Sequence, residues 1–172
     1  MKNLPPMPGS YFEKFSTKPV FIKPFDPKSR QIAEVCIELL HDLLKGYEVK
    51  ILHRGSTAFG ISGKGDIEIG IYSTEENWKA VIGVLKKYFG ELGNIEDDYA
   101  RFNTEEDGYE IEIILQKGEA AKVDVALTNY FAVRPELLKE YEGVKKKYSY
   151  SKREYQIQKD KFLRKIVEII PE

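Results

Sequence analysis

Two apolar runs joined by a glycine-rich loop constrain the fold of this chain more than any other feature. Residues 47–53 and 66–72 are rich in isoleucine, leucine and tyrosine, and the loop between them contains four glycines. Apolar, β-branched and aromatic residues favour strands. The sequence therefore predicts two neighbouring strands, joined by a loop whose glycines let the backbone approach a ligand closely.

The second predicted strand carries two carboxylates, Asp66 and Glu68, one residue apart. Because side chains alternate between the faces of a strand, both carboxylates point to one face while Ile67 and Ile69 point to the other. Like charges side by side on a sheet gain little for folding, whereas two oxygen ligands on one rigid face suit Mg²⁺. The alternative is a surface hairpin with solvated carboxylates.

A later predicted strand, residues 109–115, repeats this arrangement of acids. Glu110 and Glu112 lie one residue apart and therefore share a face. Two strands that each offer paired acids support a metal site formed between them. Glu112 and Glu110 are candidates for a third ligand, and Asp124 is a rival whose helical surroundings argue against a position on a strand.

The rest of the chain predicts an arm, a hairpin and several helices. Prolines in residues 1–24 predict an N-terminal arm with a short strand at 20–23 rather than a regular helix. Asp107-Gly108 is typical of a tight hairpin turn. Helices are predicted from apolar spacing and capping residues. They begin at Asp26-Pro27, at a capping box in residues 73–76, near Val123, at Pro135 and at a second capping box in residues 151–154.

Basic side chains near the loop and on the later helices are further candidates. Arg54 and Lys64 lie at the two ends of the loop, and His53 lies on the strand before it, where a packed histidine is commoner than a ligand. Lys159 lies on the apolar stripe of the last helix, so its ammonium must reach solvent, an acid or a phosphate. Lysines 145–147 end the preceding helix, where they suit the helix dipole.

The composition indicates an ordinary globular protein, and we expect one domain over residues 1–172 with C-terminal helices from 120–172. The 172 residues are 42% hydrophobic and 32% charged, with a net charge of −1, which argues against a nucleic-acid or membrane partner. The single cysteine, Cys36, excludes an intramolecular disulfide and a cysteine metal cluster. Because no signal-like or membrane-spanning apolar run is present, we expect a cytoplasmic location.

The turn Gly55-Ser56, followed by the acids Asp66 and Glu68, resembles the signature of the nucleotidyltransferase superfamily. Two further segments, VFIKPFDP from residue 20 and LHRGSTA from residue 52, are similar to segments of the GrpB family, also called uncharacterised protein family 0157. The resemblance covers about residues 20–165 and includes a C-terminal pattern. That pattern consists of Arg134, Pro135, Glu136, Tyr141, Lys145, Arg153, Tyr155, Lys159 and Phe162.

The resemblance implies an α+β fold with a nucleotidyltransferase-like mixed or antiparallel sheet, helices packed on it and a C-terminal helical layer. It also implies Mg²⁺- or Mn²⁺-dependent transfer of a nucleotidyl group from a nucleoside triphosphate to an unidentified acceptor. The charge favours a small-molecule or protein acceptor over a nucleic acid. A non-catalytic nucleotide-binding or regulatory module on the same fold is the alternative. The base preference and the oligomeric state stay open.

The acids have separate roles in the implied mechanism. Asp66, Glu68 and Glu112 would hold the metal, and Glu112 or Glu110 would accept the proton of the acceptor hydroxyl. Asp66 stands where many members of the family have an apolar residue, and Glu110 and Glu112 stand where the family has a His-x-His strand. The complete acid set resembles that of active nucleotidyltransferases. Leu127-Thr-Asn-Tyr130 departs from the family's Phe-Arg-Asp-Tyr.

The phosphates would be bound by the turn and by basic side chains. Gly55 and Ser56 would contact the β- and γ-phosphates through backbone N–H groups and a hydroxyl. Lys64 and Lys159 would add positive charge, and Arg54 is a further candidate for a triphosphate contact.

Overall fold

A five-stranded sheet forms the centre of the molecule, of which the computed structural model describes residues 6–171. In spatial order the strands are β1 (Val49–Arg54), β2 (Ile67–Ser73), β5 (Tyr109–Gln116), β4 (Tyr99–Glu106) and β3 (Asn94–Ile95). β2 and β5 run parallel, whereas the other neighbouring pairs are antiparallel. The sheet is therefore mixed, which confirms the predicted α+β class.

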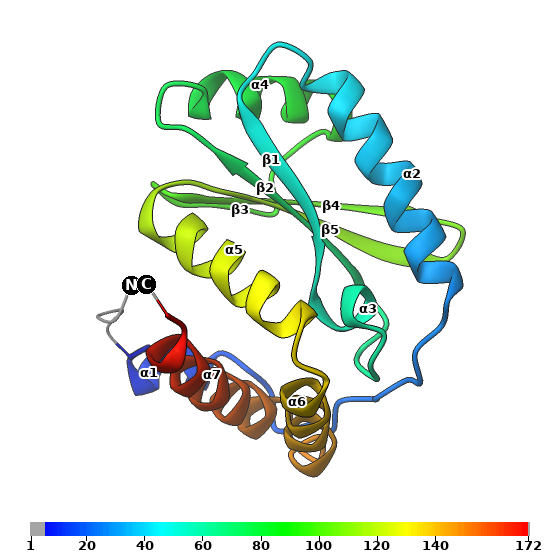
Figure 1. Cartoon of the computed structure of the whole chain (residues 1–172), viewed down its shortest axis with the longest axis vertical. Helices are drawn as coiled ribbons and strands as arrows, with labels where there is room; N and C mark the ends of the chain where they lie inside the picture. Colours follow the sequence, from blue (N-terminus) through cyan, green and yellow to red (C-terminus); the bar gives the residue numbers. More distant parts are fainter. Residues whose placement is uncertain (1–5, 172) are drawn as a thin grey trace.

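Helices cover both faces of the sheet (Figure 1). α2 (Lys28–Leu43) and α4 (Trp78–Phe89) pack on one face, and α5 (Gly118–Ala132) lies across the other. α6 (Pro135–Lys147) and α7 (Lys152–Ile169) form the C-terminal layer beyond α5, with α1 (Gly9–Glu13) beside α7. The short α3 (Gly55–Phe59) follows β1 directly.

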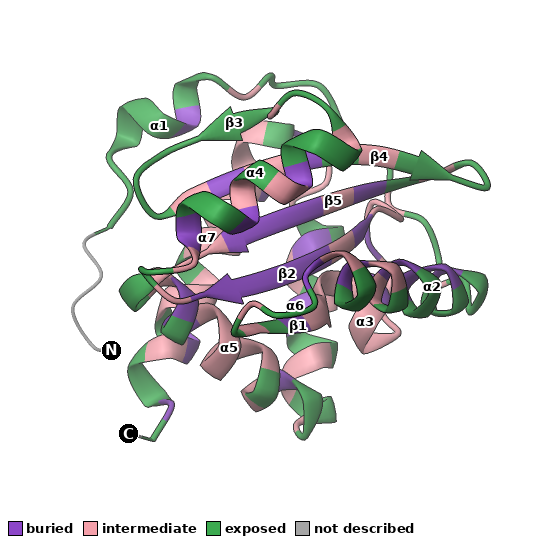
Figure 2. Cartoon of the chain, turned by 90° about the horizontal axis from the view of Figure 1, so that it is seen from above, coloured by how far each residue is buried: buried purple, intermediate pink, exposed green. Residues whose placement is uncertain are grey.

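The main core lies between the sheet and the pair α2 and α4. Ile67, Ile69 and Ile113 are fully buried there, and β2 and β5 are the most continuously buried strands (Figure 2). Glu68 and Glu112, which alternate with these isoleucines, face the other side of the sheet. The alternation predicted from the sequence is therefore present on both strands.

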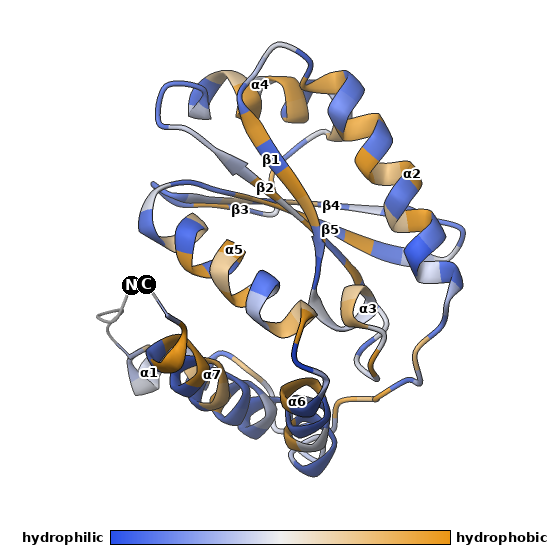
Figure 3. Cartoon of the chain, viewed as in Figure 1, coloured by the Kyte–Doolittle hydropathy of each residue, from blue (hydrophilic) through white to orange (hydrophobic). Residues whose placement is uncertain are grey.

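A second, smaller core joins the C-terminal helices. Phe131, Tyr141 and Phe162 from α5, α6 and α7 stack with ring centroids 5.5–6.4 Å apart. Figure 3 shows that the rest of the surface of α6 and α7 is largely hydrophilic. These helices are amphipathic, and their apolar sides meet one another rather than the main core.

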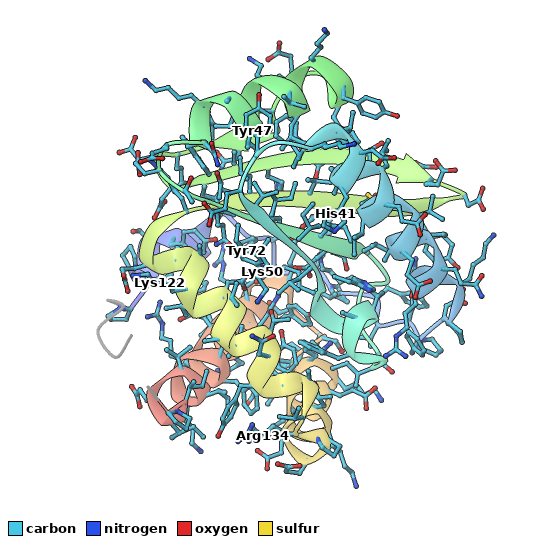
Figure 4. All side chains as sticks on the ribbon, turned by 45° about the horizontal axis from the view of Figure 1, so that its top comes forward. His41, Tyr47, Lys50, Tyr72, Lys122 and Arg134 are labelled. Atoms are coloured by element: carbon cyan, nitrogen blue, oxygen red, sulfur yellow. The ribbon has the colours of Figure 1, made fainter. Side chains whose placement is uncertain are left out.

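Three side chains on the helices show which helix sides face the core and which face solvent. Cys36 and Trp78 belong to the main core, and burial raises the pKa of the Cys36 thiol to about 11, with a smaller contribution from Glu106. His41, labelled in Figure 4, is exposed on α2.

The N-terminal arm differs from its prediction. Residues 20–23 do not form a strand, because only Lys23 makes a β-bridge, with Gly63 of the glycine loop, and Pro19 and Pro24 flank this stretch. A short helix, α1, forms directly after Pro8 where none was expected. Residues 1–5 of the predicted arm and residue 172 lie outside the described residues.

The element boundaries test the turn and cap predictions. Asp107 and Gly108 both have positive φ, 51° and 81°, which confirms the hairpin turn. The Ser151 side chain accepts a hydrogen bond from the Glu154 N–H at the start of α7, as predicted. The prediction of a capping box at residues 73–76 is wrong, because α4 begins only at Trp78 and has no side-chain cap.

None of the helices in residues 6–171 is both long and apolar enough to span a membrane.

Gly70 allows a tyrosine to lie flat along the open face of the sheet. A Cβ atom at this position would collide with the ring and hydroxyl of Tyr72, two residues along the same strand face. From there the Tyr72 hydroxyl donates a hydrogen bond to Asp124 on α5. A residue without a side chain in the middle of β2 thus lets the sheet contact the helix above it.

We predict that Gly70→Ala lowers the free energy of unfolding by about 1–3 kcal/mol, because the added methyl group overpacks a filled site. Gly83→Ala is the matched control. Gly83 lies in α4 with no atom within 4 Å of a Cβ at that position, so alanine should stabilise the helix by up to about 1 kcal/mol. Urea unfolding measures both changes. An unchanged stability in Gly70→Ala would contradict the packing described.

Candidate functional site

Two carboxylates lie side by side on the open face of the sheet. Glu68 on β2 is the register partner of Glu112 on the parallel strand β5, and Asp66 lies just before β2. Burial, then the neighbouring Glu68, and more weakly Asp66, raise the pKa of Glu112. The three acids predicted to form a metal site therefore lie close enough to repel one another.

Each of these acids faces a basic side chain. Lys64 Nζ lies 2.7 Å from Asp66 Oδ2, and Arg54 Nε lies 3.4 Å from Glu68 Oε2. Arg101 Nη1 is farther from Glu112 Oε1, at 3.9 Å. Burial alone would raise the pKa of Glu68, but Arg54 and, more weakly, three lysines hold it below its usual value. The ion pair with Arg54 therefore favours the ionised form of Glu68 in a partly buried place.

Arg54 joins the sheet to α5. Besides Glu68, its guanidinium donates to the carboxylate of Asp124, which also accepts from Tyr72. Tyr72 lies between the sheet and α5 in Figure 4. Asp124, the rival third ligand, therefore lies on a helix and is engaged by an arginine and a tyrosine, while Glu112 lies directly beside Glu68.

The turn after β1 lies against the acids. Gly55 has a φ of 76°, and a Cβ atom there would lie only 2.8 Å from Glu68 Oε1. Glycine thus serves two needs at this position, a left-handed backbone and close approach to a carboxylate. The sequence predicted a loop here, but Gly55–Phe59 forms the short helix α3.

The glycine loop is held by two side chains of α6. Glu142 Oε1 accepts from the Ser62 N–H at 2.7 Å, and Lys145 Nζ donates to the Ser62 carbonyl at 2.6 Å. Lys145 also donates to the hydroxyl of Ser56. Only 1% of Lys145 is exposed, and burial, followed by the nearby Lys159, lowers its pKa to about 8.

Lys145 is the site residue that the sequence prediction misassigned. It was expected to complement the helix dipole among lysines 145–147, yet its ammonium reaches the turn. Its position four residues after Tyr141, on the buried side of α6, was the available signal. A lysine on an apolar helix stripe has to find a partner.

Lys159 reaches the same place from α7. It lines a small cavity of about 60 Å³ together with Gly55, Ser56, Lys64, Asp66 and Glu68, which we call the turn pocket. Within residues 6–171, its ammonium makes no hydrogen bond or ion pair, unlike those of Lys64 and Lys145. The turn pocket therefore combines carboxylates with a lysine ammonium that has no hydrogen-bond or ion-pair partner among the described residues.

Glu110 does not join this cluster. It is exposed near the start of β5 and lines a different cavity, of about 550 Å³, beside the N-terminal arm. The predicted residues thus do not share one cavity: Lys64 and Asp66 line both of these cavities, whereas Glu112 lines neither.

The donor set fits a hard divalent cation, because Asp66, Glu68 and Glu112 offer only carboxylate oxygens. Nevertheless, residues 6–171 contain no three His, Cys, Asp or Glu side chains already grouped closely enough to hold a metal ion. The basic partners explain this, since Lys64 and Arg54 occupy the positions next to two of the carboxylates. A metal would have to replace at least the Lys64 contact.

His53 is a packed histidine, as predicted. Its Nε2 lies 2.9 Å from the Thr57 hydroxyl, and burial, then Arg30, lowers its pKa to about 4. It therefore stays neutral near pH 7.

Comparisons with known proteins bear on the family and the fold of this chain. A family model described as GrpB protein matches residues 19–168. Among curated proteins, none matches the sequence. Among solved structures, a chain of the GLD-2/RNP-8 complex has a TM-score of 0.56 and 12% identity, over 90% of this chain and 60% of that one. This likeness shows a nucleotidyltransferase fold.

Two further similar structures have lower scores. The Cid1 poly(U) polymerase with Mg and 3′-dATP bound has a TM-score of 0.49 and 10% identity, over 80% of this chain and 46% of that one. Polymerase beta of Leishmania infantum in a ternary gap complex has a TM-score of 0.43 and 11% identity, over 80% and 49%. The chain thus spans less than two thirds of the length of each of the three structures.

The pKa of His53 predicts a loss of stability in mild acid. Its pKa is about 4 in the folded chain against 6.5 for a free histidine, so the unfolded chain takes up the proton first. The contribution of neutral His53 to the stability of the fold is fully present above pH 6.5 and is lost as the pH falls toward 4. Between pH 7 and pH 5 this histidine should lower the free energy of unfolding by about 2 kcal/mol.

Urea unfolding at both pH values measures this loss in the unmodified chain, in His53→Gln and in His41→Gln. Only His53→Gln should lose the pH-dependent component, because His41 is exposed. The same pH dependence in His53→Gln as in the unmodified chain would contradict the assignment.

Proposed function

The chain belongs to the GrpB family, and from its fold and its carboxylates we propose that it is a nucleotidyltransferase. It transfers a nucleotidyl group from a nucleoside triphosphate to a small-molecule or protein acceptor, with Mg²⁺ or Mn²⁺ as cofactor. One observation supports this most strongly. Glu68 and Glu112 are neighbours in register beside a Gly-Ser turn that Lys145 contacts and that shares a pocket with Lys64 and Lys159.

Asp66, Glu68 and Glu112 would hold the metal. When bound, a divalent cation neutralises phosphate charge and orients the reacting oxygens. The Lys64 ammonium, now on Asp66, would then be free to turn toward a phosphate. Nucleotide and metal should accordingly bind together. The metal would displace Lys64 from Asp66, and a phosphate of the nucleotide would give the Lys64 ammonium a new partner.

The turn pocket would receive the phosphates. Lys145 donates its hydrogen bond to the Ser56 oxygen, so the Ser56 hydroxyl proton is free to point toward a ligand. Lys64 and Lys159 would add charge, and Gly55 would allow the backbone to approach. Arg54 is less available for a phosphate, because it already balances Glu68 and Asp124.

The chemical step is a displacement at the α-phosphorus. The acceptor hydroxyl oxygen forms a bond to phosphorus, the bond from phosphorus to the oxygen bridging to the β-phosphate breaks, and pyrophosphate leaves. The hydroxyl proton passes to a carboxylate, Glu112 or Glu110. The raised pKa of Glu112 makes it the better proton acceptor of the buried acids.

A non-catalytic nucleotide-binding module is the second candidate. The observation that favours it is that Asp66, Glu68 and Glu112 each face a basic side chain. Such a module would bind a triphosphate through the lysines without a metal and would release no pyrophosphate. Binding measured with and without Mg²⁺, followed by an assay for pyrophosphate, separates the two candidates.

We predict that Asp66→Asn lowers Mg²⁺-dependent pyrophosphate release by at least about a hundredfold, because a metal ligand is lost. Asp97→Asn is the control, since Asp97 is an exposed acid away from the site, and it should behave like the unmodified chain. Thermal unfolding checks that Asp66→Asn is folded. Full activity in a folded Asp66→Asn variant would rule out the proposed metal site.

We predict that Lys145→Met weakens binding of a non-hydrolysable ATP analogue by about 10- to 100-fold, the equivalent of one or two charged hydrogen bonds. Isothermal titration calorimetry with Mg²⁺ measures the affinity. Lys147→Met, an exposed lysine of the same helix, is the control and should bind normally. Normal affinity in Lys145→Met would show that the buried ammonium only holds the loop.

A further inference from the structure

A second cavity, of about 550 Å³, lies beside the turn pocket and shares Lys64 and Asp66 with it. We call it the arm pocket. The N-terminal arm provides Lys23 and Asp26, the glycine loop provides Lys64 and Asp66, and the hairpin of β4 and β5 provides Glu105 and Glu110. Its volume falls within the usual range for small-molecule sites.

We propose that the arm pocket binds the acceptor and that the acceptor is a small hydroxylated amine, a molecule with at least one protonated amino group and one hydroxyl group. This inference rests on the proposed nucleotidyltransferase function and names the substrate class of the same site.

The position of the arm pocket suits an acceptor. Lys64 and Asp66 line it and also line the turn pocket, so an acceptor hydroxyl at this boundary lies next to a phosphate on the turn. The turn pocket, at about 60 Å³, cannot hold an acceptor as well. Glu110, a candidate proton acceptor, lies on the arm-pocket side.

The walls of the arm pocket are fixed by long-range contacts. Lys23 and Gly63 exchange two backbone hydrogen bonds, of 2.7 and 3.1 Å, which join the arm to the glycine loop. The Tyr109 hydroxyl donates to Asp26, which joins β5 to the end of the arm. Three segments distant in sequence are thus held around one space, as a small-molecule site requires.

The charges of the arm pocket favour a cation. Glu105 and Glu110 lie directly opposite each other on β4 and β5, and in the described structure neither contacts a basic side chain. Like charges in such a pair repel. An ammonium group placed between them would relieve the repulsion and donate two charged hydrogen bonds, one to each carboxylate. Lys23 also lines this pocket, and its side chain lies along Gly65.

The chemistry requires a hydroxyl as well as the amine. A protonated amine has no free electron pair and cannot attack phosphorus, so the amine serves for binding and the hydroxyl for reaction. The hydroxyl oxygen forms the new bond to the α-phosphorus, pyrophosphate leaves, and the proton passes to a carboxylate. The product is a phosphodiester between the nucleoside and the hydroxyl oxygen.

The test uses the β-1,4-linked disaccharide of glucosamine and its di-N-acetylated form as a matched pair of probes. Both have the same rings and hydroxyl groups, but only the first carries protonated amines. Calorimetry without nucleotide or metal measures their binding to the full chain. We expect the amine form to bind at least about tenfold more tightly, the effect of one charged hydrogen bond.

The double variant Glu105→Gln/Glu110→Gln should lose this preference. Glu91→Gln/Glu96→Gln, which changes two exposed acids outside the arm pocket, should keep it. Equal binding of the two probes to the unmodified chain, or a preference that persists in the first double variant, would overturn the inference.

The outcome is distinguishable from a failure of the proposed function. Amine-selective binding that depends on Glu105 and Glu110 supports the ligand class of the arm pocket even if no pyrophosphate is released. The absence of pyrophosphate release would contradict only the proposed nucleotidyltransferase activity. Pyrophosphate release with a different acceptor, without amine selectivity, would overturn the inference and leave the function standing.

Discussion

Arg54 has to balance two carboxylates that lie on different layers of the molecule, and the rest of the site depends on this balance. Its guanidinium contacts Glu68 on the sheet and Asp124 on α5. A partly buried carboxylate without a cation would be costly. Because Arg54 satisfies both acids, the open face of the sheet can keep charged residues while α5 packs across it. The carboxylate cluster is thus built into the fold.

The C-terminal helices complete the site rather than only covering it. Glu142 and Lys145 bond the N–H and the carbonyl of Ser62, and Lys23 bonds Gly63 from the other side. The glycine loop is therefore held between α6 and the arm. This arrangement fixes the loop that separates the turn pocket from the arm pocket and links nucleotide binding to the packing of α6.

The local parts of the structure were predictable, whereas the long-range ones were not. Alternation placed Asp66 and Glu68 opposite Ile67 and Ile69, because strand periodicity depends only on neighbours. The sequence could not reveal that Lys145 bonds Ser56, a residue 89 positions away. The spacing from Tyr141 places Lys145 on the buried side of its helix but does not say which distant segment that side meets. The prediction for a short segment was wrong for a related reason. Gly55–Phe59 became a helix because its surroundings, not its composition, determine its conformation.

A crystal structure with Mn²⁺ and a non-hydrolysable triphosphate tests the central claim most directly. The account predicts an anomalous Mn²⁺ peak within coordination distance of Asp66 and Glu68, with the triphosphate against Gly55 and Ser56 and the Lys64 ammonium moved from Asp66 to a phosphate. A triphosphate bound with Lys64 still on Asp66, and Mn²⁺ absent or held by other residues, would contradict it.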